Sequence, residues 1–348
     1  MNKKTVLHIL NTGEYSGAEN VAITIIKNYP NYLQGIYMSR NGSISEILAN
    51  EKICYYGVDK LSIQEIRKAI KKYQPNLIHA HDFTASLLAA TATMSIPVIS
   101  HLHNNVPWMR RVTLRSLLYR LAIKKYDKIL TVSDAVIKEC WYCAKLKKKA
   151  ICIGNPIDLK RILEKKQSKI ETKLLFIGRL SEQKNPIEFL NIIKNLTELG
   201  LPISATMLGR GELEDTCKQY VRENHLQQIV QMKGFVDSPY DYLNYGSILV
   251  LPSEWEGYGL VVVEAFAFGV PVVANPVGGI ATLVNSDCGY LSSKRSDKEN
   301  EIKKLVLDPQ YYDMKSKNAK KRAEELENME KYMSMLETIY QNAIEPLK

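Results

Sequence analysis

Two cations follow a short apolar stretch that ends in glycine. Arg179 and Lys184 lie five residues apart, in a loop that leads from a predicted strand ending at Gly178 to a predicted helix beginning near Pro186. An arginine can fork two phosphate oxygens, and a lysine adds a movable point charge. Together with helix amides, such cations stabilise the negative charge that grows on a departing diphosphate. The pair alone fits a solvated surface loop equally well.

Two acids and two glycines form a second constellation. Glu256 precedes a loop with Gly257 and Gly259, and Glu264 lies eight residues further on, inside a predicted helix. If the whole stretch were helical, the carboxylates would be roughly 12 Å apart along the axis. That is about the length of a nucleotide-sugar from ribose to hexose, so each acid could accept hydrogen bonds from the hydroxyls at one end. The glycines would let backbone amides approach phosphate.

Four histidines form two pairs, His79 with His81 and His101 with His103. A spacing of two residues directs both members of a pair to the same face of a strand. The pattern raises the possibility of zinc. No carboxylate or thiol set completes such a site in the sequence, so we expect no metal here.

Short, wholly apolar strands alternate with amphipathic helical stretches along the chain. Examples lie at 6–10, 128–132, 174–177 and 248–251. Strands of this kind suit a parallel sheet that is covered on both faces, so the predicted class is α/β. A polar stretch without apolar periodicity divides the series. The expected parts are a domain at 1–157, a linker at 158–172, a domain at 173–325 and a C-terminal helix at 326–348 that packs back toward the first domain.

Charge is unevenly distributed between the two halves of the chain. Residues 1–160 hold 23 lysines and arginines against 11 acids, a net of +12, whereas the rest holds 24 against 26, a net of −2. The basic half predicts an anionic partner. The sequence contains no run of 18 apolar residues, so no transmembrane helix is predicted. The N-terminal apolar stretch is too short for a signal peptide, and we therefore expect a cytoplasmic protein.

The constellations at 176–186 and 252–273 resemble those of the family-4 retaining glycosyltransferases, which include bacterial capsular and exopolysaccharide enzymes. That resemblance implies the GT-B fold, with two Rossmann-like, doubly wound parallel-sheet domains and a cleft between them. It implies that Arg179 and Lys184 bind the donor diphosphate, that Glu256 contacts the donor sugar and that Glu264 contacts ribose. Further donor-binding residues implied by the resemblance are Gly178, Gly209, Phe235, Val236, Gly257, Tyr258, Gly259 and Leu260.

The first half of the chain resembles the same family. Gly17 matches a glycine-rich loop near the phosphates, although Ser16 replaces its first glycine, and His103 matches a histidine that faces the transferred sugar. The resemblance implies transfer of a hexose from a nucleotide-diphosphate sugar, with UDP favoured, to a glycan or lipid-linked acceptor. It also implies retention at the anomeric carbon without a metal or other cofactor. Pro156, where glycine is common, would stiffen the hinge between the domains.

A basic, amphipathic stretch provides a candidate membrane contact. Residues 107–126 are predicted to form a helix with a leucine stripe and six cations, and 145–149 adds a second basic cluster. Anionic lipid attracts such a surface, which would place the protein peripherally on the inner face of the membrane, although a solvated helix is the alternative. Nucleic acid is not expected, because the clusters lack interleaved aromatic residues.

Three other protein classes are compatible with parts of the pattern. A nucleotide-sugar epimerase with the same two-domain shape would also bind diphosphate, but would release product without an acceptor. A dinucleotide dehydrogenase would require a full Gly-x-Gly-x-x-Gly loop, which residues 11–19 do not supply. The remaining alternative is a non-catalytic basic binding protein.

Overall fold

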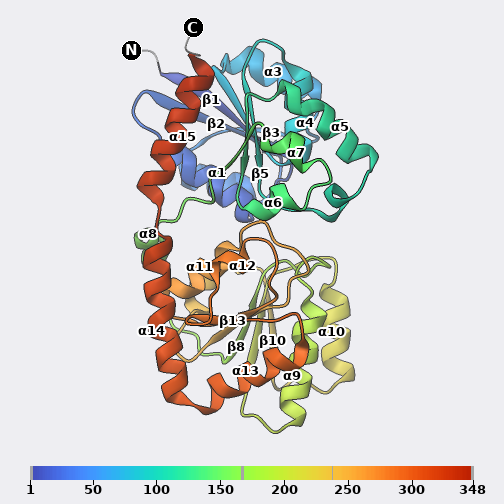
Figure 1. The fold of residues 1–348 in the computed structure, drawn as a ribbon, viewed down its shortest axis with the longest axis vertical. Helices are drawn as coiled ribbons and strands as arrows, with labels where there is room; N and C mark the ends of the chain where they lie inside the picture. Colours follow the sequence, from blue (N-terminus) through green and yellow to red (C-terminus); the bar gives the residue numbers. More distant parts are fainter. Residues whose placement is uncertain (1–2, 166–167, 237, 346–348) are drawn as a thin grey trace. The chain divides into compact units, whose positions relative to one another are not determined.

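The computed structural model describes residues 3–165, 168–236 and 238–345, which form two compact units, each with one parallel sheet (Figure 1). The first unit comprises Met1–Pro156 and Asn328–Lys348, and the second comprises Ile157–Glu327. Each sheet is covered by helices. The predicted α/β class with two parallel-sheet domains is therefore confirmed.

The first unit has a seven-stranded parallel sheet with the order β3-β2-β1-β4-β5-β6-β7. Its strands are β1 (Lys4–Leu10), β2 (Leu33–Arg40), β3 (Cys54–Val58), β4 (Leu77–His81), β5 (Val98–Leu102), β6 (Lys128–Thr131) and β7 (Ala150–Cys152). Its helices are α1 (Gly17–Lys27), α2 (Ile44–Asn50), α3 (Ile63–Tyr73), α4 (Phe83–Ala92), η1 (Pro107–Arg110), α5 (Leu114–Ala122), η2 (Ile123–Lys125), α6 (Asp134–Lys138), α7 (Cys143–Lys147) and α15 (Met329–Ile344).

The second unit has a six-stranded parallel sheet with the order β10-β9-β8-β11-β12-β13. Its strands are β8 (Leu174–Ile177), β9 (Ala205–Leu208), β10 (Val230–Gly234), β11 (Ile248–Leu251), β12 (Val272–Ala274) and β13 (Gly289–Leu291). Its helices are α8 (Leu159–Glu164), α9 (Pro186–Glu198), α10 (Glu214–Glu223), η3 (Pro239–Tyr242), α11 (Leu260–Ala267), α12 (Ile280–Leu283), α13 (Arg295–Leu307) and α14 (Pro309–Leu326).

The apolar strands of the second unit feed two cores, one on each face of the sheet. Leu174 and Phe176 of β8 enter a cluster with α9, α10 and α13, whereas Leu175 between them enters a cluster with α11 and α14. Successive side chains of a strand point to opposite faces, so a strand covered on both sides must be apolar throughout. This is why the strands show no polar alternation in the sequence.

In each sheet, the side on which successive strands are added changes once, and all strands stay parallel. In the first sheet β1 pairs with both β2 and β4, and in the second sheet β8 pairs with both β9 and β11. The connection that follows β1 and the one that follows β4 run to opposite faces of the sheet, and the same holds for β8 and β11. This opens a crevice at the carboxyl ends of each of these two pairs of strands. The loops after β1 and β4, and after β8 and β11, are therefore the places where each unit can bind a ligand.

Two segments differ from the elements predicted for them. The expected linker at 158–172 begins with the helix α8, which packs on α11 within the second unit. The single helix predicted for 107–126 is wrong, since the structure has η1, α5 and η2 instead. Thr113 and Ser116 form a capping box, in which each side chain accepts a hydrogen bond from the backbone of the other, and this starts α5 separately.

None of the helices in the described part of the chain combines the length and the apolar character that crossing a bilayer requires.

Candidate active site

The loops that follow β8, β9, β10 and β11 meet at the carboxyl edge of the second sheet. Backbone hydrogen bonds join them in pairs: the amide of Leu180 donates to Arg210, that of Gly209 to Gly234, and that of Glu254 to Gln183, over 2.7 to 3.0 Å. The predicted donor-binding residues in these loops therefore belong to one connected rim.

Lys184 and Glu256 form an ion pair across the switch point between β8 and β11. Glu256 is buried, with 5% of its surface exposed, and its Oε1 atom also accepts a hydrogen bond of 2.9 Å from the hydroxyl of Ser253. Lys184 is partly buried. The sequence predicted a cation for phosphate and an acid for sugar, but it did not predict that the two side chains bind each other.

Arg179 is exposed, and its guanidinium group makes no hydrogen bond or ion pair with the described residues. Its backbone is held firmly, because its carbonyl accepts from the amide of Ser181 at 2.9 Å and the next residue, Leu180, donates to Arg210 at 3.0 Å. Arg179 thus offers five donors from a fixed backbone, which is the arrangement that a phosphate group can use.

Gly209 allows two of these loops to approach closely. Its φ angle is +134°, and a Cβ atom at this position would lie 1.9 Å from the carbonyl oxygen of Gly178. Beyond the same rim, 53% of the Phe235 surface is exposed, and Val236 is partly buried. An exposed phenylalanine beside a glycine-lined edge is a surface on which a planar base can stack.

The glycine loop after β11 leads directly into α11. Gly259 caps this helix with a φ angle of +97°, and Leu260 is its first residue. The loop is packed from the other side by Gly278, where a Cβ atom would lie 1.7 Å from the carbonyl oxygen of Glu256. The sequence interpretation missed Gly278, because a lone glycine pair after a strand resembles an ordinary turn. Gly257 is buried and Tyr258 is partly buried in the same loop.

Glu264 lies on α11, as predicted, and is partly buried. Burial raises the pKa of its carboxyl group, while Lys165 and the hydroxyl of Tyr240, which lies 3.3 Å away, act in the opposite direction. The helix begins only at Leu260, so the stretch from Glu256 to Glu264 is not helical throughout and the helical spacing of roughly 12 Å does not apply.

A buried lysine on α13 supports the loop that follows β11, and it was not identified from the sequence. Lys298 on α13 is 1% exposed, and its ammonium group donates to Asn275 Oδ1 at 2.7 Å. The amide of Asn275 in turn donates to the carbonyl oxygens of Pro252 and Ser253 at 3.2 and 3.1 Å. Burial lowers the pKa of Lys298. In the sequence it is one of several lysines on a charged helix, and nothing local marks it as buried.

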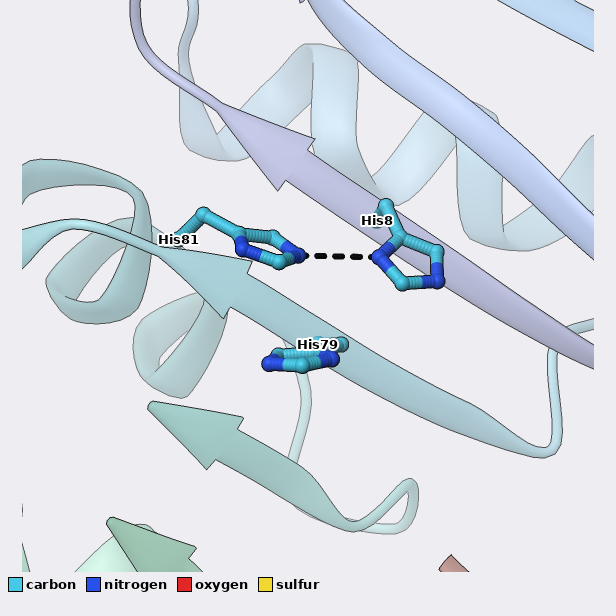
Figure 2. A group of neighbouring side chains, drawn as sticks. All are labelled: His8, His79 and His81. Carbon is cyan, nitrogen blue, oxygen red and sulfur yellow. Dashed lines mark hydrogen bonds between the residues drawn. The ribbon is translucent and has the colours of Figure 1, made fainter. Parts of the chain in front are cut away.

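The first unit places a group of histidines on one face of its sheet. His8 on β1 and His79 and His81 on β4 point toward one another, and His8 Nδ1 lies 2.9 Å from His81 Nε2 (Figure 2). His81 Nδ1 lies 3.0 Å from Nε2 of His103, which is partly exposed beyond the end of β5. His101 on β5 is fully buried and bonds His79.

Two subsets of these histidines have the proximity that a metal site requires. One nitrogen from each ring lies within 4.8 Å of the others in the group His8, His79 and His81, and likewise in His81, His101 and His103. However, the ring nitrogens that face each other are already hydrogen-bonded partners. Neither group contains a carboxylate or thiolate, so a metal here would be held by imidazoles alone and would have to displace these hydrogen bonds.

Gly17 is the first residue of α1, at the loop that follows β1. Ser16, which replaces the glycine expected from the resemblance, uses its hydroxyl to bind the carboxylate of Glu19. Glu19 is itself 1% exposed. The serine therefore has a local structural partner, while Gly17 lies at the carboxyl edge of the first sheet, as the sequence predicted.

Asp82 is a further residue at this edge that the sequence interpretation did not identify. It follows β4 with a φ angle of +127°, which is strained for a residue with a side chain. Its carboxylate accepts from the amides of Ala85 at 2.8 Å and Asn11 at 3.1 Å, so it ties α4 to the loop after β1. Burial raises its pKa to about 6.

Comparison with known proteins agrees with this architecture. The family model "Glycosyltransferase Family 4" matches residues 8–161, and "Glycosyl transferases group 1" matches residues 160–322. An uncharacterized glycosyltransferase of Haemophilus influenzae is 27% identical over 89% of this chain and 92% of its own length. An Escherichia coli enzyme named UDP-Gal:alpha-D-GlcNAc-diphosphoundecaprenol alpha-1,3-galactosyltransferase is 24% identical over 81% of this chain and 79% of its own length.

Solved structures show the same fold. The crystal structure of Anabaena HepE in complex with UDP and glucose matches with a TM-score of 0.81 and 19% identity, and covers 96% of this chain and 98% of HepE. A sucrose-phosphate synthase of Thermosynechococcus elongatus matches with a TM-score of 0.76 and 16% identity, over 98% of this chain and 99% of the other.

The two parallel-sheet units have the GT-B fold, and the two matching family models show that the chain is a glycosyltransferase. The chain belongs to glycosyltransferase family 4, with its second half formed by the group 1 domain of that family. The family predicted from the residue motifs is confirmed. The roles of the individual site residues stay predictions.

Proposed function

We propose that this glycosyltransferase moves a hexose-type sugar from a UDP-sugar to a glycan or lipid-linked acceptor, in the synthesis of a cell-surface polysaccharide. The observation that carries the proposal is the meeting of Lys184 and Glu256 at the switch point of the second sheet. The guanidinium group of Arg179, which pairs with none of the described residues, lies on the adjoining rim. Opposite charges held next to each other suit a ligand in which a diphosphate adjoins a hydroxyl-rich sugar.

In the proposed reaction the bond from the anomeric carbon to the diphosphate breaks as the acceptor oxygen approaches from the same face. Arg179, Lys184 and the amides at the start of α11 stabilise the charge that forms on the diphosphate. The acceptor proton passes to the departing phosphate oxygen, so the configuration is retained without a nucleophilic side chain. Because these groups carry the positive charge, no metal ion or other cofactor takes part.

The remaining site residues bind the two ends of the donor. Glu256 accepts hydrogen bonds from sugar hydroxyls, and Glu264 accepts them from ribose. Gly178, Gly209 and Gly257 let the backbone approach the phosphates, while Phe235 and Val236 border the base. The family resemblance assigns Gly17 to the phosphates and His103 to the transferred sugar, and both roles are part of this proposal. HepE has been crystallised in complex with UDP-glucose, and the E. coli relative is named for UDP-Gal, so both favour a UDP-sugar.

A thermal-shift screen of nucleotide-diphosphate sugars in the presence of EDTA tests the donor class. A ligand at 100 times its Kd stabilises the folded protein by about 2.7 kcal/mol, which raises the Tm by several degrees. We expect UDP-sugars to raise the Tm without added metal and GDP-sugars to have little effect. A shift that requires Mg²⁺ or Mn²⁺ contradicts metal independence. Conversion of the donor sugar without an acceptor would indicate an epimerase instead.

We also propose that the protein contacts an anionic membrane surface, where it would meet a lipid-linked acceptor. This contact would hold a cytoplasmic protein peripherally on the inner face of the membrane. The four leucines of α5 are exposed rather than packed in the core, with 74% of Leu114 and 64% of Leu121 accessible. The second basic cluster lies against the same helix, because the ammonium group of Lys145 donates to the carbonyl oxygen of Arg120 at 2.8 Å. Apolar side chains beside clustered cations are typical of interfacial helices.

Sedimentation with vesicles tests this contact. We expect binding to phosphatidylglycerol vesicles but not to phosphatidylcholine vesicles, and we expect it to weaken as salt is raised. Replacing Leu118 with serine should weaken binding at least about tenfold, since a buried leucine is worth roughly 1.5–3 kcal/mol. Leu199→Ser, at an exposed leucine of the second unit, is the matched control and should bind normally. Equal binding by both variants would contradict the assignment to α5.

A further inference from the structure

The five buried or partly buried histidines of the first unit belong to one unbranched chain of hydrogen bonds that also contains two tyrosines. Its middle is the contact between the hydroxyl groups of Tyr29 and Tyr340, 3.2 Å apart, where α15 packs on the sheet. From Tyr29 one arm runs to His103 at the exposed end, and from Tyr340 the other arm runs to the buried His101. The members in order are His103, His81, His8, Tyr29, Tyr340, His79 and His101.

The five histidines of this hydrogen-bonded series are all neutral. Burial lowers the pKa of His8 and of His103 to about 3, and it lowers the pKa of the other three well below the usual range. A neutral imidazole has one N–H and one bare nitrogen, and each tyrosine has one O–H. Seven members therefore supply seven protons to six hydrogen bonds. An imidazole that bonds on both sides donates to one neighbour and accepts from the other, so all the bonds of one arm point in the same direction.

The contact between the two tyrosines sets the direction of the arm that ends at His103. The hydroxyl of Tyr29 donates to that of Tyr340, so Tyr29 must accept from His8 Nε2. His8 Nδ1 is then bare and accepts from His81, which in turn accepts from His103 Nε2. The proton of His103 thus lies on Nε2. Its Nδ1 atom has no partner among the described residues and is left as a hydrogen-bond acceptor.

The opposite direction of this arm is also chemically possible. Tyr29 would then donate to His8 Nε2, and the proton of His103 would lie on Nδ1. Both directions keep the three hydrogen bonds that join His103, His81, His8 and Tyr29, so the contact between the two tyrosines can decide between them.

We propose that Tyr340 is a positioning residue that sets the tautomer of His103 through Tyr29, His8 and His81. As the acceptor for the Tyr29 hydroxyl, it holds the arm in the direction that leaves His103 Nδ1 bare. His103 can then accept a hydrogen bond from a hydroxyl group of a bound sugar. Only this last role of His103 rests on the proposed function, because the tautomer is a property of the free protein.

Nitrogen NMR of the ¹⁵N-histidine-labelled full chain tests the proposal directly. The chain has only six histidines, and the signals of His103 are identified by their loss in His103→Gln. We expect Nε2–H in the unmodified protein. In Tyr340→Phe the Tyr29 hydroxyl keeps only His8 Nε2 as a partner, so it should donate its proton to that nitrogen. The hydrogen bonds from Tyr29 to His103 would then all point the other way, and the His103 proton would move to Nδ1. An unchanged His103 tautomer in Tyr340→Phe overturns the proposal.

Two further variants separate this effect from a general disturbance of α15. Tyr332 lies on the same helix, is 2% exposed, and its hydroxyl has no partner in the described structure, so Tyr332→Phe should leave the His103 signals unchanged. Tyr29→Phe removes the link between the two arms and should give both His103 tautomers. A tautomer change in Tyr332→Phe, or a single unchanged tautomer in Tyr29→Phe, argues for a purely structural role.

Activity and zinc give two additional readouts. With UDP-glucose as the probe donor, Tyr340→Phe should lower kcat about tenfold and leave the affinity for UDP unchanged, and Tyr332→Phe should do neither. The histidine spectra should be the same in EDTA and with ZnCl₂ alone, because the facing nitrogens are engaged with each other. A zinc-induced change in the signals of His81, His101 and His103 would replace the hydrogen-bonded chain with a metal site and overturn the proposal.

Discussion

Arg179→Ala and Lys184→Ala should each lower turnover with a UDP-sugar donor by about two orders of magnitude or more. Losing one preorganised electrostatic donor at a developing oxyanion costs roughly 3 kcal/mol in the transition state. Steady-state kinetics of nucleotide release measures the effect. Arg222→Ala, at an exposed arginine of α10, is the control and should keep normal turnover. Near-normal turnover in both site variants would contradict the assignment of these cations to the leaving group.

The structure predicts that the two variants differ in stability. Arg179 is exposed and without a partner in the described structure, so its removal should change the free energy of unfolding by no more than about 0.5 kcal/mol. Lys184 pairs with a buried carboxylate, and removing one partner of such a pair costs about 3 kcal/mol. Adding Glu256→Gln to Lys184→Ala should restore stability in denaturant unfolding without restoring turnover. If the double variant turns over as fast as Glu256→Gln alone, Lys184 acts only on the fold.

Glu256→Gln alone should weaken sugar transfer about 10- to 100-fold while largely keeping the affinity for UDP. Glutamine has the same shape and can still accept from Ser253 and Lys184, but it loses the charge that strengthens hydrogen bonds from sugar hydroxyls. Calorimetry with UDP and kinetics with a UDP-sugar measure the two quantities separately.

Glu254→Gln is the matched control for that variant. Glu254 lies two residues earlier in the same loop, is exposed, and accepts from the side chain of Asn185 at 2.7 Å. Glutamine can keep this contact, so transfer should be close to normal. Loss of UDP binding in Glu256→Gln would show that Glu256 binds the nucleotide rather than the sugar.

Local sequence patterns were sufficient for the class of fold and for the loops that make up the site. Apolar strands such as 174–177 and 248–251 predicted parallel sheets, because a strand covered on both faces has no polar side. The motif residues at 178–184 and 256–264 were placed correctly at strand ends and in the following helix. Edge strands such as β3 were not singled out, since they are only partly buried and carry little apolar signal.

Pairings between distant residues were decided only by the tertiary structure. Lys184 and Glu256 are separated by 72 positions, and Tyr340 reaches His79 across 261 positions. No local periodicity encodes which strand lies next to which, or where a terminal helix packs. The burial of Lys298 on α13 and the exposure of the leucines on α5 depend in the same way on what covers each helix.

The sequence by itself thus determined the chemistry that is available to this protein: cations, acids and glycines at the ends of buried strands, and histidines spaced for one face of a sheet. The tertiary structure alone decided which of these groups neutralise each other, which are left free, and which are linked by hydrogen bonds into a single chain. The physical reason is that residue type and spacing act over a few residues, whereas pairing, burial and proton position depend on strand order and on packing between distant segments.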